Sequence, residues 1–159
     1  MHFNPFHTSS QIISGMVSVG SHTQFQLSVV YASNSANDRK ELWEFIGKIA
    51  PPANIPWAIV GDFNCCRFAS DKIGGSPLTQ SALFDFNNMI FVNSLLDLHS
   101  IGSKFTWFNQ RPDNPIHIKL DRVLVNDCWL KAFPESYYSL QSPSTSDHCP
   151  IIIHSGTLD

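Results

Sequence analysis

Two polar residues follow one of the most apolar short runs of the chain. Residues 57–60 suit a buried strand, which breaks at Gly61 and leads into Asp62 and Asn64. Side chains alternate along a strand, so residues two positions apart point to the same side. A carboxylate and an amide at a strand end are how an open α/β sheet presents polar groups to a ligand. Asp and Asn are also ordinary turn formers, so this motif alone leaves both a turn and a site open.

A second polar motif lies near the other end of the sequence. Asp147 and His148 stand together there, and Asp121 falls in the middle of a predicted strand at 116–125. A carboxylate inside an apolar strand is costly unless it is paired, and His148 is its natural partner. An imidazole oriented by a buried carboxylate can take a proton from a reacting group or give one to it. Asp62 and Asp147 would supply the hard oxygen ligands that Mg²⁺ or Mn²⁺ prefers.

Three motifs, taken in this order along the chain, carry a family resemblance. Gly-Asp-Phe-Asn at 61–64, Leu-Asp-Arg at 120–122 and Ser-Asp-His-Cys-Pro at 146–150 resemble the endonuclease/exonuclease/phosphatase superfamily, which has the deoxyribonuclease-I-like fold. Further runs are similar to the endonuclease domain of non-LTR (LINE-type) retrotransposons, especially the plant elements. These runs are 71–75, 105–109 and 126–129. The resemblance covers the chain from about Val29 to the end.

The resemblance implies an α/β fold, a four-layer sandwich of two packed mixed β-sheets flanked by helices. We expect one domain over residues 1–159 that is incomplete at the N-terminus, because the family has two earlier strands that this chain does not match. One of those strands carries a glutamate that is a principal metal ligand. None of the residues Glu41, Glu44 and Glu135 occupies the matching position.

The same resemblance implies a phosphodiesterase that depends on Mg²⁺ or Mn²⁺ and nicks DNA by water attack. His148, held by Asp121, would be the general base or the group that polarises the phosphate. Asp62 would orient or deprotonate the water, and Asn64 would donate a hydrogen bond to the phosphate. Asp147 would assist Asp62 in holding the metal.

Three further residues are candidates for contacts with the substrate. By resemblance, Tyr31 would hydrogen-bond the phosphate, with Asn34 close behind it. Arg39 lies in the first turn of a predicted helix, where the helix dipole disfavours a cation, so a phosphate partner is conceivable. Each has a plain alternative: Tyr31 as an aromatic with its hydroxyl in water, and Arg39 as a solvated surface residue.

Two other functions stay open beside the nuclease. One is a truncated remnant of such a domain without hydrolase activity, which the unmatched glutamate favours. The other is a phosphatase that acts on small or lipid phosphates.

The composition of the chain limits which of these functions remain plausible. The chain has 159 residues, 43% of them hydrophobic, with ten Lys and Arg against thirteen Asp and Glu. That balance argues against a broad basic surface for nucleic acid, but divalent ions neutralise an acid-rich nuclease site locally. The four cysteines have no C-x-x-C spacing, so neither a zinc ribbon nor a redox motif is indicated. From composition we expect an intracellular protein with no membrane span and no obligate protein partner. The resemblance implies DNA as its partner and, if the domain is active, action in the nucleus.

Periodicity predicts the elements that would position these groups. Residues 1–10 are expected to be a frayed end. Phe25, Leu27 and Val29 are expected on the core face of their strand, and Trp107 inside. A helix should begin near Asp38 and stop at Pro51. Two more helices are expected at 80–96, with Leu83, Phe84, Phe86, Met89, Ile90 and Val92 in the core, and at 127–133. Strands are expected at 11–19, 24–31, 57–63, 104–109, 116–125, 137–140 and 151–153.

Overall fold

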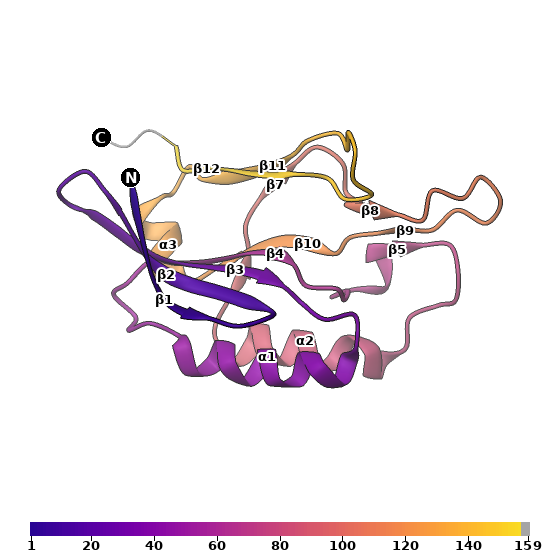
Figure 1. The fold of residues 1–159 in the computed structure, drawn as a ribbon, viewed down its shortest axis with the longest axis horizontal. Coiled ribbons are helices and arrows are strands. Elements are labelled where there is room, and N and C mark those ends of the chain that lie inside the picture. The colour runs from indigo at the N-terminus through magenta and orange to yellow at the C-terminus, as the bar shows by residue number, and fades with distance from the viewer. Residues whose placement is uncertain (157–159) are drawn as a thin grey trace.

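A mixed sheet of six strands forms the centre of the computed structural model, which describes residues 1–156 (Figure 1). Residues 157–159, the end of the predicted domain, lie outside the described residues. All neighbouring strands of this sheet run antiparallel except β3 and β4, which are parallel. In spatial order the strands are β1 (His2–Thr8), β2 (Ile12–Val19), β3 (Thr23–Tyr31), β4 (Trp57–Asp62), β10 (Asp121–Val125) and β6 (Leu96–Asp97).

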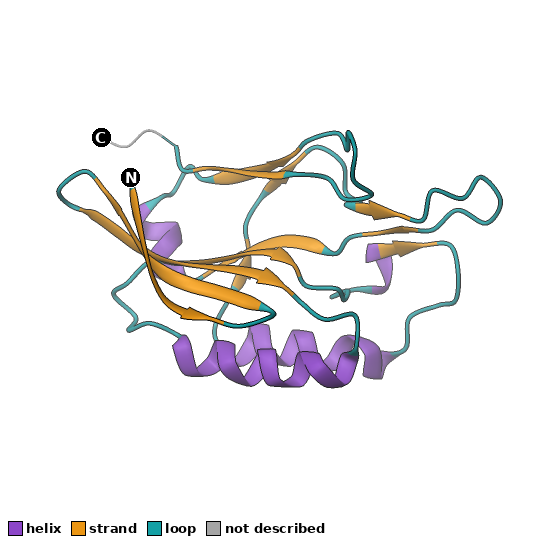
Figure 2. Ribbon diagram, in the orientation of Figure 1, coloured by secondary structure: helices purple, strands orange, loops and turns teal. Residues whose placement is uncertain are grey.

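Two smaller sheets complete the strands that the structure describes. The second sheet is mixed and contains β12 (Ile151–His154), β11 (Tyr137–Leu140) and β7 (Ser100–Ile101). The third consists of three two-residue strands, β5 (Lys72–Ile73), β9 (His117–Ile118) and β8 (Trp107–Phe108). The helices are α1 (Ala36–Ile49), α2 (Gln80–Val92) and α3 (Asp127–Ala132), with a 3₁₀ turn at Ala69–Asp71. Figure 2 shows α1 and α2 along one side of the large sheet and the second sheet on its other side. The predicted α/β class with packed mixed sheets is therefore confirmed.

Helix α1 shows how local sequence sets an element. Ser35 caps it, because its hydroxyl accepts a hydrogen bond from the amide of Asp38. The helix ends just before Pro51, which cannot continue it. The expected start near Asp38 is two residues late, since the cap lies at Ser35. Leu42, Trp43 and Ile46 form its buried face.

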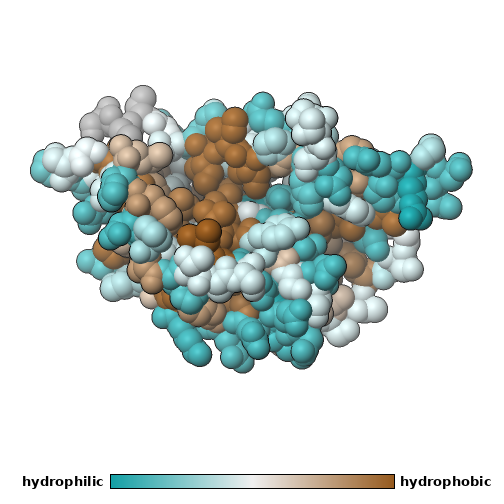
Figure 3. Space-filling view, viewed as in Figure 1, coloured by the Kyte–Doolittle hydropathy of each residue, from teal (hydrophilic) through white to brown (hydrophobic). Residues whose placement is uncertain are grey.

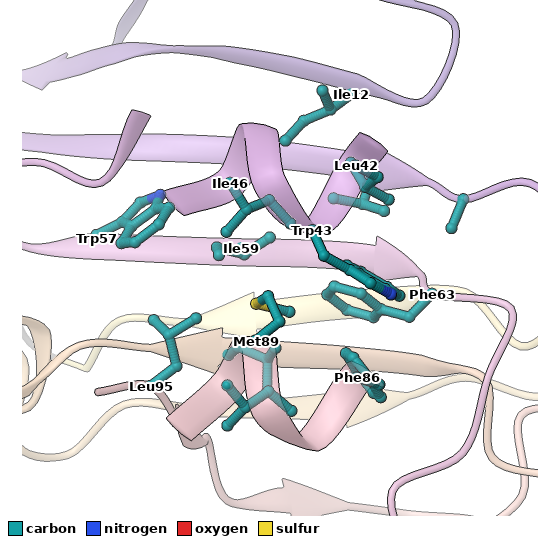
Figure 4. Close-up of a cluster of buried hydrophobic side chains, with 14 residues drawn as sticks. Ile12, Leu42, Trp43, Ile46, Trp57, Ile59, Phe63, Phe86, Met89 and Leu95 are labelled. Carbon is teal, nitrogen blue, oxygen red and sulfur yellow. The ribbon is translucent and has the colours of Figure 1, made fainter. Parts of the chain in front are cut away.

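Aromatic rings join the two long helices to the large sheet (Figure 4). The ring of Trp43 stacks on that of Phe86 with centroids 5.2 Å apart, and Phe86 lies 5.1 Å from Phe63 at the end of β4. Ile59 and Leu124, from β4 and β10, are fully buried against these helices. This packing holds the ends of β4 and β10 in place.

The other face of the large sheet packs on the second sheet and α3. Val123 and Val125 of β10 contact a cluster that includes Tyr138 and Leu140 of β11. The second sheet has three strands against six, so it does not cover the whole face. Figure 3 shows hydrophobic side chains gathered between the two sheets. Val29 projects from the same face as Phe25 and Leu27 but is 44% exposed, so its predicted burial is wrong, whereas Phe25 and Leu27 do pack against this cluster.

Gly61 permits the close approach of β3 and β4. Its φ is +142°, and a Cβ at this position would collide with the carbonyl oxygen of Val30. Only glycine adopts that backbone at no steric cost. The resulting parallel register sets Tyr31 beside Asp62.

Several predicted elements differ from the structure. Residues 2–8 are not frayed; they form β1, which pairs antiparallel with β2 along its length, with an irregularity between Pro5 and His7. The expected strand at 104–109 shrinks to two residues, and the one at 116–125 breaks at residues 119–120, so Asp121 starts β10 instead of lying within a strand.

Two predictions of burial in α2 and β8 also need correction. Phe84 and Val92 of α2 are 65% and 63% exposed, because the face of the helix toward the sheet carries Phe86, Met89 and Ile90. Trp107 is only half-buried. No helix within residues 1–156 has both the length and the apolar character needed to cross a membrane.

Candidate functional site

One row of side chains crosses the end of the large sheet. Tyr31 of β3 is the register partner of Asp62 in β4, and Asp62 is the partner of Asp121 in β10. Register partners on neighbouring strands project from the same face. Three of the predicted site residues, far apart in sequence, are therefore neighbours at one edge of the fold.

His148 joins this row from the segment before β12. Its Nδ1 lies 2.8 Å from Oδ2 of Asp121, and its Nε2 lies 3.6 Å from Oδ2 of Asp62. An ionised carboxylate can only accept, so Nδ1 carries the proton in the shorter contact, and in the neutral imidazole Nε2 keeps a free lone pair. The predicted pairing of Asp121 with His148 is present, with Nε2 turned toward the second carboxylate.

The electrostatics of Asp62 reflect its surroundings. Burial raises the pKa of this carboxyl from 3.8 to about 6, the nearby negative charge of Asp121 adds to the rise, and a hydrogen bond from the amide of Asn64 opposes it. Only 7% of Asp62 is exposed. Two carboxylates and one imidazole thus share a small, acid-rich space that would be stabilised by a cation or a proton.

The pKa of His148 depends on burial and on its two carboxylate neighbours. Its partial burial lowers the pKa of the imidazole, but the hydrogen bond to Asp121 and the charges of Asp121 and Asp62 outweigh burial, so the pKa is raised above 6.5. The side chain keeps 28% of its surface exposed, so a substrate can reach it.

Asn64 is held in the left-handed backbone region, with φ of +52°, a conformation that Asn tolerates better than most residues. Its amide N–H donates to Oδ1 of Asp62 at 2.8 Å, and its side-chain nitrogen donates to the carbonyl of Ala32 at 2.7 Å. Asn64 therefore ties the end of β4 to the end of β3. The simple alternation expected from the sequence does not extend to it, because β4 ends at Asp62.

Asp147 lies apart from the two buried carboxylates. It is exposed, and its carboxylate accepts a hydrogen bond from the indole nitrogen of Trp107 at 2.8 Å. That hydrogen bond lowers the pKa of Asp147. The backbone of His148 pairs with Trp107 in an isolated β-bridge, so one aromatic residue contacts both members of the predicted Asp-His motif.

The remaining candidates lie around the row. Tyr31 is 70% exposed and shares with Asn34 and Asn64 the wall of a hollow of about 480 Å³. Arg39 donates to the carbonyl of Ser33 at 2.8 Å. Its positive charge is near enough to lower the pKa of Asp62.

The acid-rich cluster suits a cation. Asp62, Asp121 and His148 each offer one ligand atom, and these atoms lie within 4.8 Å of one another. Carboxylate oxygens are the preferred ligands of Mg²⁺ and Mn²⁺. Burial, with the nearby charge of Asp121, raises the pKa of Asp62, and a bound cation would stabilise its ionised form. Within residues 1–156 this group includes neither Asp147 nor any glutamate. The donor set thus fits a divalent ion at Asp62, with Asp147 outside it.

Sequence reasoning missed the residue that links the parts of the site. Thr106 is fully buried, and its hydroxyl oxygen accepts hydrogen bonds from the amides of Leu120 and Asp121. The sequence did contain a signal for this residue. Thr106 lies between Phe105 and Trp107 in a predicted strand, so its small polar side chain points to the opposite face from theirs, and that face is the buried one.

Comparison with solved structures shows the same fold in several proteins. The endonuclease domain of TRAS1, a telomere-specific non-LTR retrotransposon, matches with a TM-score of 0.71 and 12% identity, over 95% of this chain and 68% of that one. The 3′ phosphatase NExo from Neisseria, solved with a product DNA hairpin, gives 0.68 and 18%, over 96% and 69%. The AP endonuclease LMAP from Leishmania major gives 0.67 and 12%, over 89% and 53%. At these identities the likeness shows the fold alone.

Two sequence comparisons complete the picture. No curated protein matches the chain. The model of the Endonuclease/Exonuclease/phosphatase family matches residues 6–148, which include the row at the end of the large sheet and its histidine. The chain belongs to the Endonuclease/Exonuclease/phosphatase family.

Proposed function

We propose that the chain is a divalent-metal-dependent phosphodiesterase that nicks DNA, of the retrotransposon endonuclease type. The observation that carries the proposal is the arrangement of His148 between two carboxylates, with Nδ1 bonded to Asp121 and Nε2 open toward Asp62. Phosphodiester hydrolysis needs a base for the attacking water and stabilisation of charge on the phosphoryl oxygens. The imidazole offers the base, and a divalent ion held at the carboxylates would supply the charge stabilisation.

The residues divide the work as follows. Asp121 holds the imidazole in the tautomer that leaves Nε2 free to accept a proton from water or to contact a phosphoryl oxygen. Asp62, with a pKa of about 6, orients the water and, when ionised, accepts its proton. The fold already uses one amide hydrogen of Asn64 for Ala32, which leaves the other for the phosphate.

Positive and polar groups on the rim would bind the substrate. Tyr31, Asn34 and Arg39 lie beside the row and would contact phosphates of the DNA backbone, because each offers a hydrogen-bond donor. A divalent ion would be held by Asp62, and Asp147, whose carboxylate bonds to Trp107 in this structure, is the second acid that we propose to assist it. When bound, such an ion supplies charge stabilisation for the phosphoryl oxygens.

Support for DNA as the substrate comes from the relatives. The TRAS1 domain is described as an endonuclease, and the Neisseria protein is bound to a DNA hairpin. The retrotransposon origin, the plant source and action in the nucleus are parts of the same proposal, as is the assignment of residues 1–159 to one domain.

A domain without hydrolase activity is the competing reading. One observation favours it: the ligand group within the described residues contains no glutamate and leaves Asp147 outside. A site with fewer acidic ligands would bind Mg²⁺ weakly.

Nicking of supercoiled plasmid in Mg²⁺ or Mn²⁺ tests the proposal. His148→Ala should remove nicking, whereas His22→Ala should not, because His22 is exposed in the turn between β2 and β3 at the far end of the strand from Tyr31. Equal nicking by all three proteins would indicate a contaminating nuclease. Absence of nicking by the wild type would support the inactive reading. Phosphate release from a phosphoinositide without nicking would favour the phosphatase instead.

A further inference from the structure

We propose that Thr106 is a positioning residue that sets the distance between Asp121 and His148. The inference deepens the proposed function, and it rests on that function only for its effect on catalysis. Thr106 lies just before β8 and is fully buried, so it contacts neither solvent nor substrate.

The side chain of Thr106 fixes the backbone that carries the carboxylate of Asp121. Its Oγ1 accepts one hydrogen bond from the amide of Leu120 at 2.9 Å and another from the amide of Asp121 at 3.0 Å. A threonine hydroxyl has two lone pairs, so one oxygen can satisfy both donors. These amides lie where β9 has ended at Ile118 and β10 begins at Asp121. The hydroxyl of Thr106 therefore takes the place of a strand partner for two backbone amides at the break before Asp121.

The backbone of Thr106 fixes the histidine segment. Its carbonyl accepts from the amide of Cys149 at 2.9 Å, and its amide donates to Ile118 at 3.0 Å. The next residue, Trp107, bridges to His148. Thr106 is therefore bonded to the residue adjacent to the histidine and, through its hydroxyl, to the aspartate itself.

This double attachment matters because the two partners come from separate parts of the chain. Asp121 and His148 are 27 positions apart and meet at 2.8 Å. A catalytic pair must be held within roughly 0.5 Å of its working geometry by residues that are themselves fixed. Loss of the hydroxyl would leave two buried N–H groups without a partner, which the backbone would relieve by moving toward water. That movement would pull Asp121 away from the imidazole.

The test compares variants that keep or remove the oxygen. Thr106→Val keeps the shape and loses both lone pairs, whereas Thr106→Ser keeps the oxygen. Ser28→Ala is the matched control: Ser28 is fully buried in β3, and its hydroxyl also accepts two hydrogen bonds, from Trp57 and Ser14. Ser28 lies away from the break between β9 and β10.

Two measurements are made on each variant. The first is the downfield proton NMR resonance of His148 Nδ1–H, identified by its absence in His148→Ala. It reports the hydrogen bond to Asp121 directly and needs no activity. The second is the rate of plasmid nicking in Mg²⁺. We expect Thr106→Val to lose the resonance by exchange with water and to nick on the order of 10–100-fold more slowly. Thr106→Ser and Ser28→Ala should keep both, although Ser28→Ala should melt at a lower temperature.

Other results would overturn the proposal. An unchanged resonance in Thr106→Val, or the same loss in Ser28→Ala, would show that Thr106 supports the fold without setting the pair. If the valine variant does not fold, Thr106→Ala carries the same comparison with serine, since its smaller side chain leaves room for a water at the two amides. If no protein nicks, the wild type included, the proposed function fails while the resonance still decides the role of Thr106.

Discussion

Two neighbouring residues of β10 belong to charged clusters of opposite character. Asp121 faces the second sheet and pairs with His148, whereas Arg122 faces the helices and pairs with Asp71 and Asp97. We call the second cluster the ion network; it also includes Arg67, whose guanidinium lies 2.5 Å from Asp97. Both clusters lie at the end of the large sheet, and one strand holds both.

The clusters differ in charge balance. The ion network sets two arginines against two aspartates, and Asp71 also accepts hydrogen bonds from the amides of Arg67 and Phe68. Its charges are matched within the fold. The site sets Asp62 and Asp121 against a single imidazole, and the pKa of Asp62 is raised to about 6 as a result of burial. Perturbed, unmatched charge in an accessible place is the physical mark of function, and matched buried charge is the mark of structure.

The largest effect is expected on activity, from the site side of β10. His148→Ala should reduce nicking by about 10²–10⁴-fold, the usual contribution of a general base. The free energy of unfolding should also fall, by about 1–3 kcal/mol, because the buried carboxylate of Asp121 loses its donor. Initial rates and urea denaturation of the same preparation check both statements. A variant that unfolds as it loses activity would contradict the separation of the two clusters.

Arg122→Met tests the other side of the strand. It removes the charge and leaves Asp71 buried and without its arginine, so the free energy of unfolding should fall by about 3–5 kcal/mol. Lys131→Met is the matched control, because Lys131 pairs with Asp127 on the surface and exposed pairs contribute little. Urea denaturation at pH 7 measures both. Similar midpoints for the two variants would argue against a stabilising network.

Replacing Asp121 and replacing Asp147 should have different effects on the stability of the fold. Asp121→Ala leaves Nδ1 of a half-buried imidazole without its acceptor, which should destabilise the fold by about 1–3 kcal/mol. Asp147→Ala should have a smaller effect, because Asp147 is exposed and its hydrogen bond to the indole of Trp107 lies at the surface. Thermal melting at pH 7 gives the comparison. Equal shifts would mean that the burial of Asp121 adds nothing.

The smallest effect concerns pH. The folded-state pKa of Asp62 is raised from 3.8 to about 6, so its stabilising contribution is complete below about pH 4 and is lost as the pH rises toward 6. Asp62→Asn cannot ionise and should escape this loss. The melting temperature of the variant relative to wild type should therefore rise between pH 4 and 6.

The raised pKa of His148 acts in the same direction at higher pH. The protonated imidazole stabilises the fold below about pH 6.5, and this contribution fades as the pH passes the raised folded-state pKa.

Mn²⁺ at pH 7 should raise the melting temperature of the wild type and not of Asp62→Asn, because a ligand that binds only the folded state stabilises it. Equal shifts on adding the metal would place it elsewhere.

Much of the site could be predicted from the sequence because its residues sit in local patterns. The apolar run before Asp62 identifies β4, and the strand-like residues after Asp121 identify β10. The order of the motifs then predicts that Tyr31, Asp62, Asp121 and His148 belong to one site. The register of the sheet sets the first three side by side.

The rest depends on contacts between distant residues. The partners of Arg122 are 51 and 25 positions away, and periodicity carries no information about them. Thr106 was missed because its importance comes from a strand break at residues 119–120 that appears in sequence as one continuous strand. The exposure of Val29 depends on how far the second sheet extends, which alternation in β3 alone does not specify.

Gly61 has a consequence for how this site tolerates variation. Because any side chain there would run into the carbonyl of Val30, a saturation library should contain no functional replacement at position 61. Asp62, one residue on, should still accept changes that keep its shape when the library is selected for folding alone. Comparing selections for folding and for nicking would therefore separate the two positions, with glycine required in both and aspartate in only one.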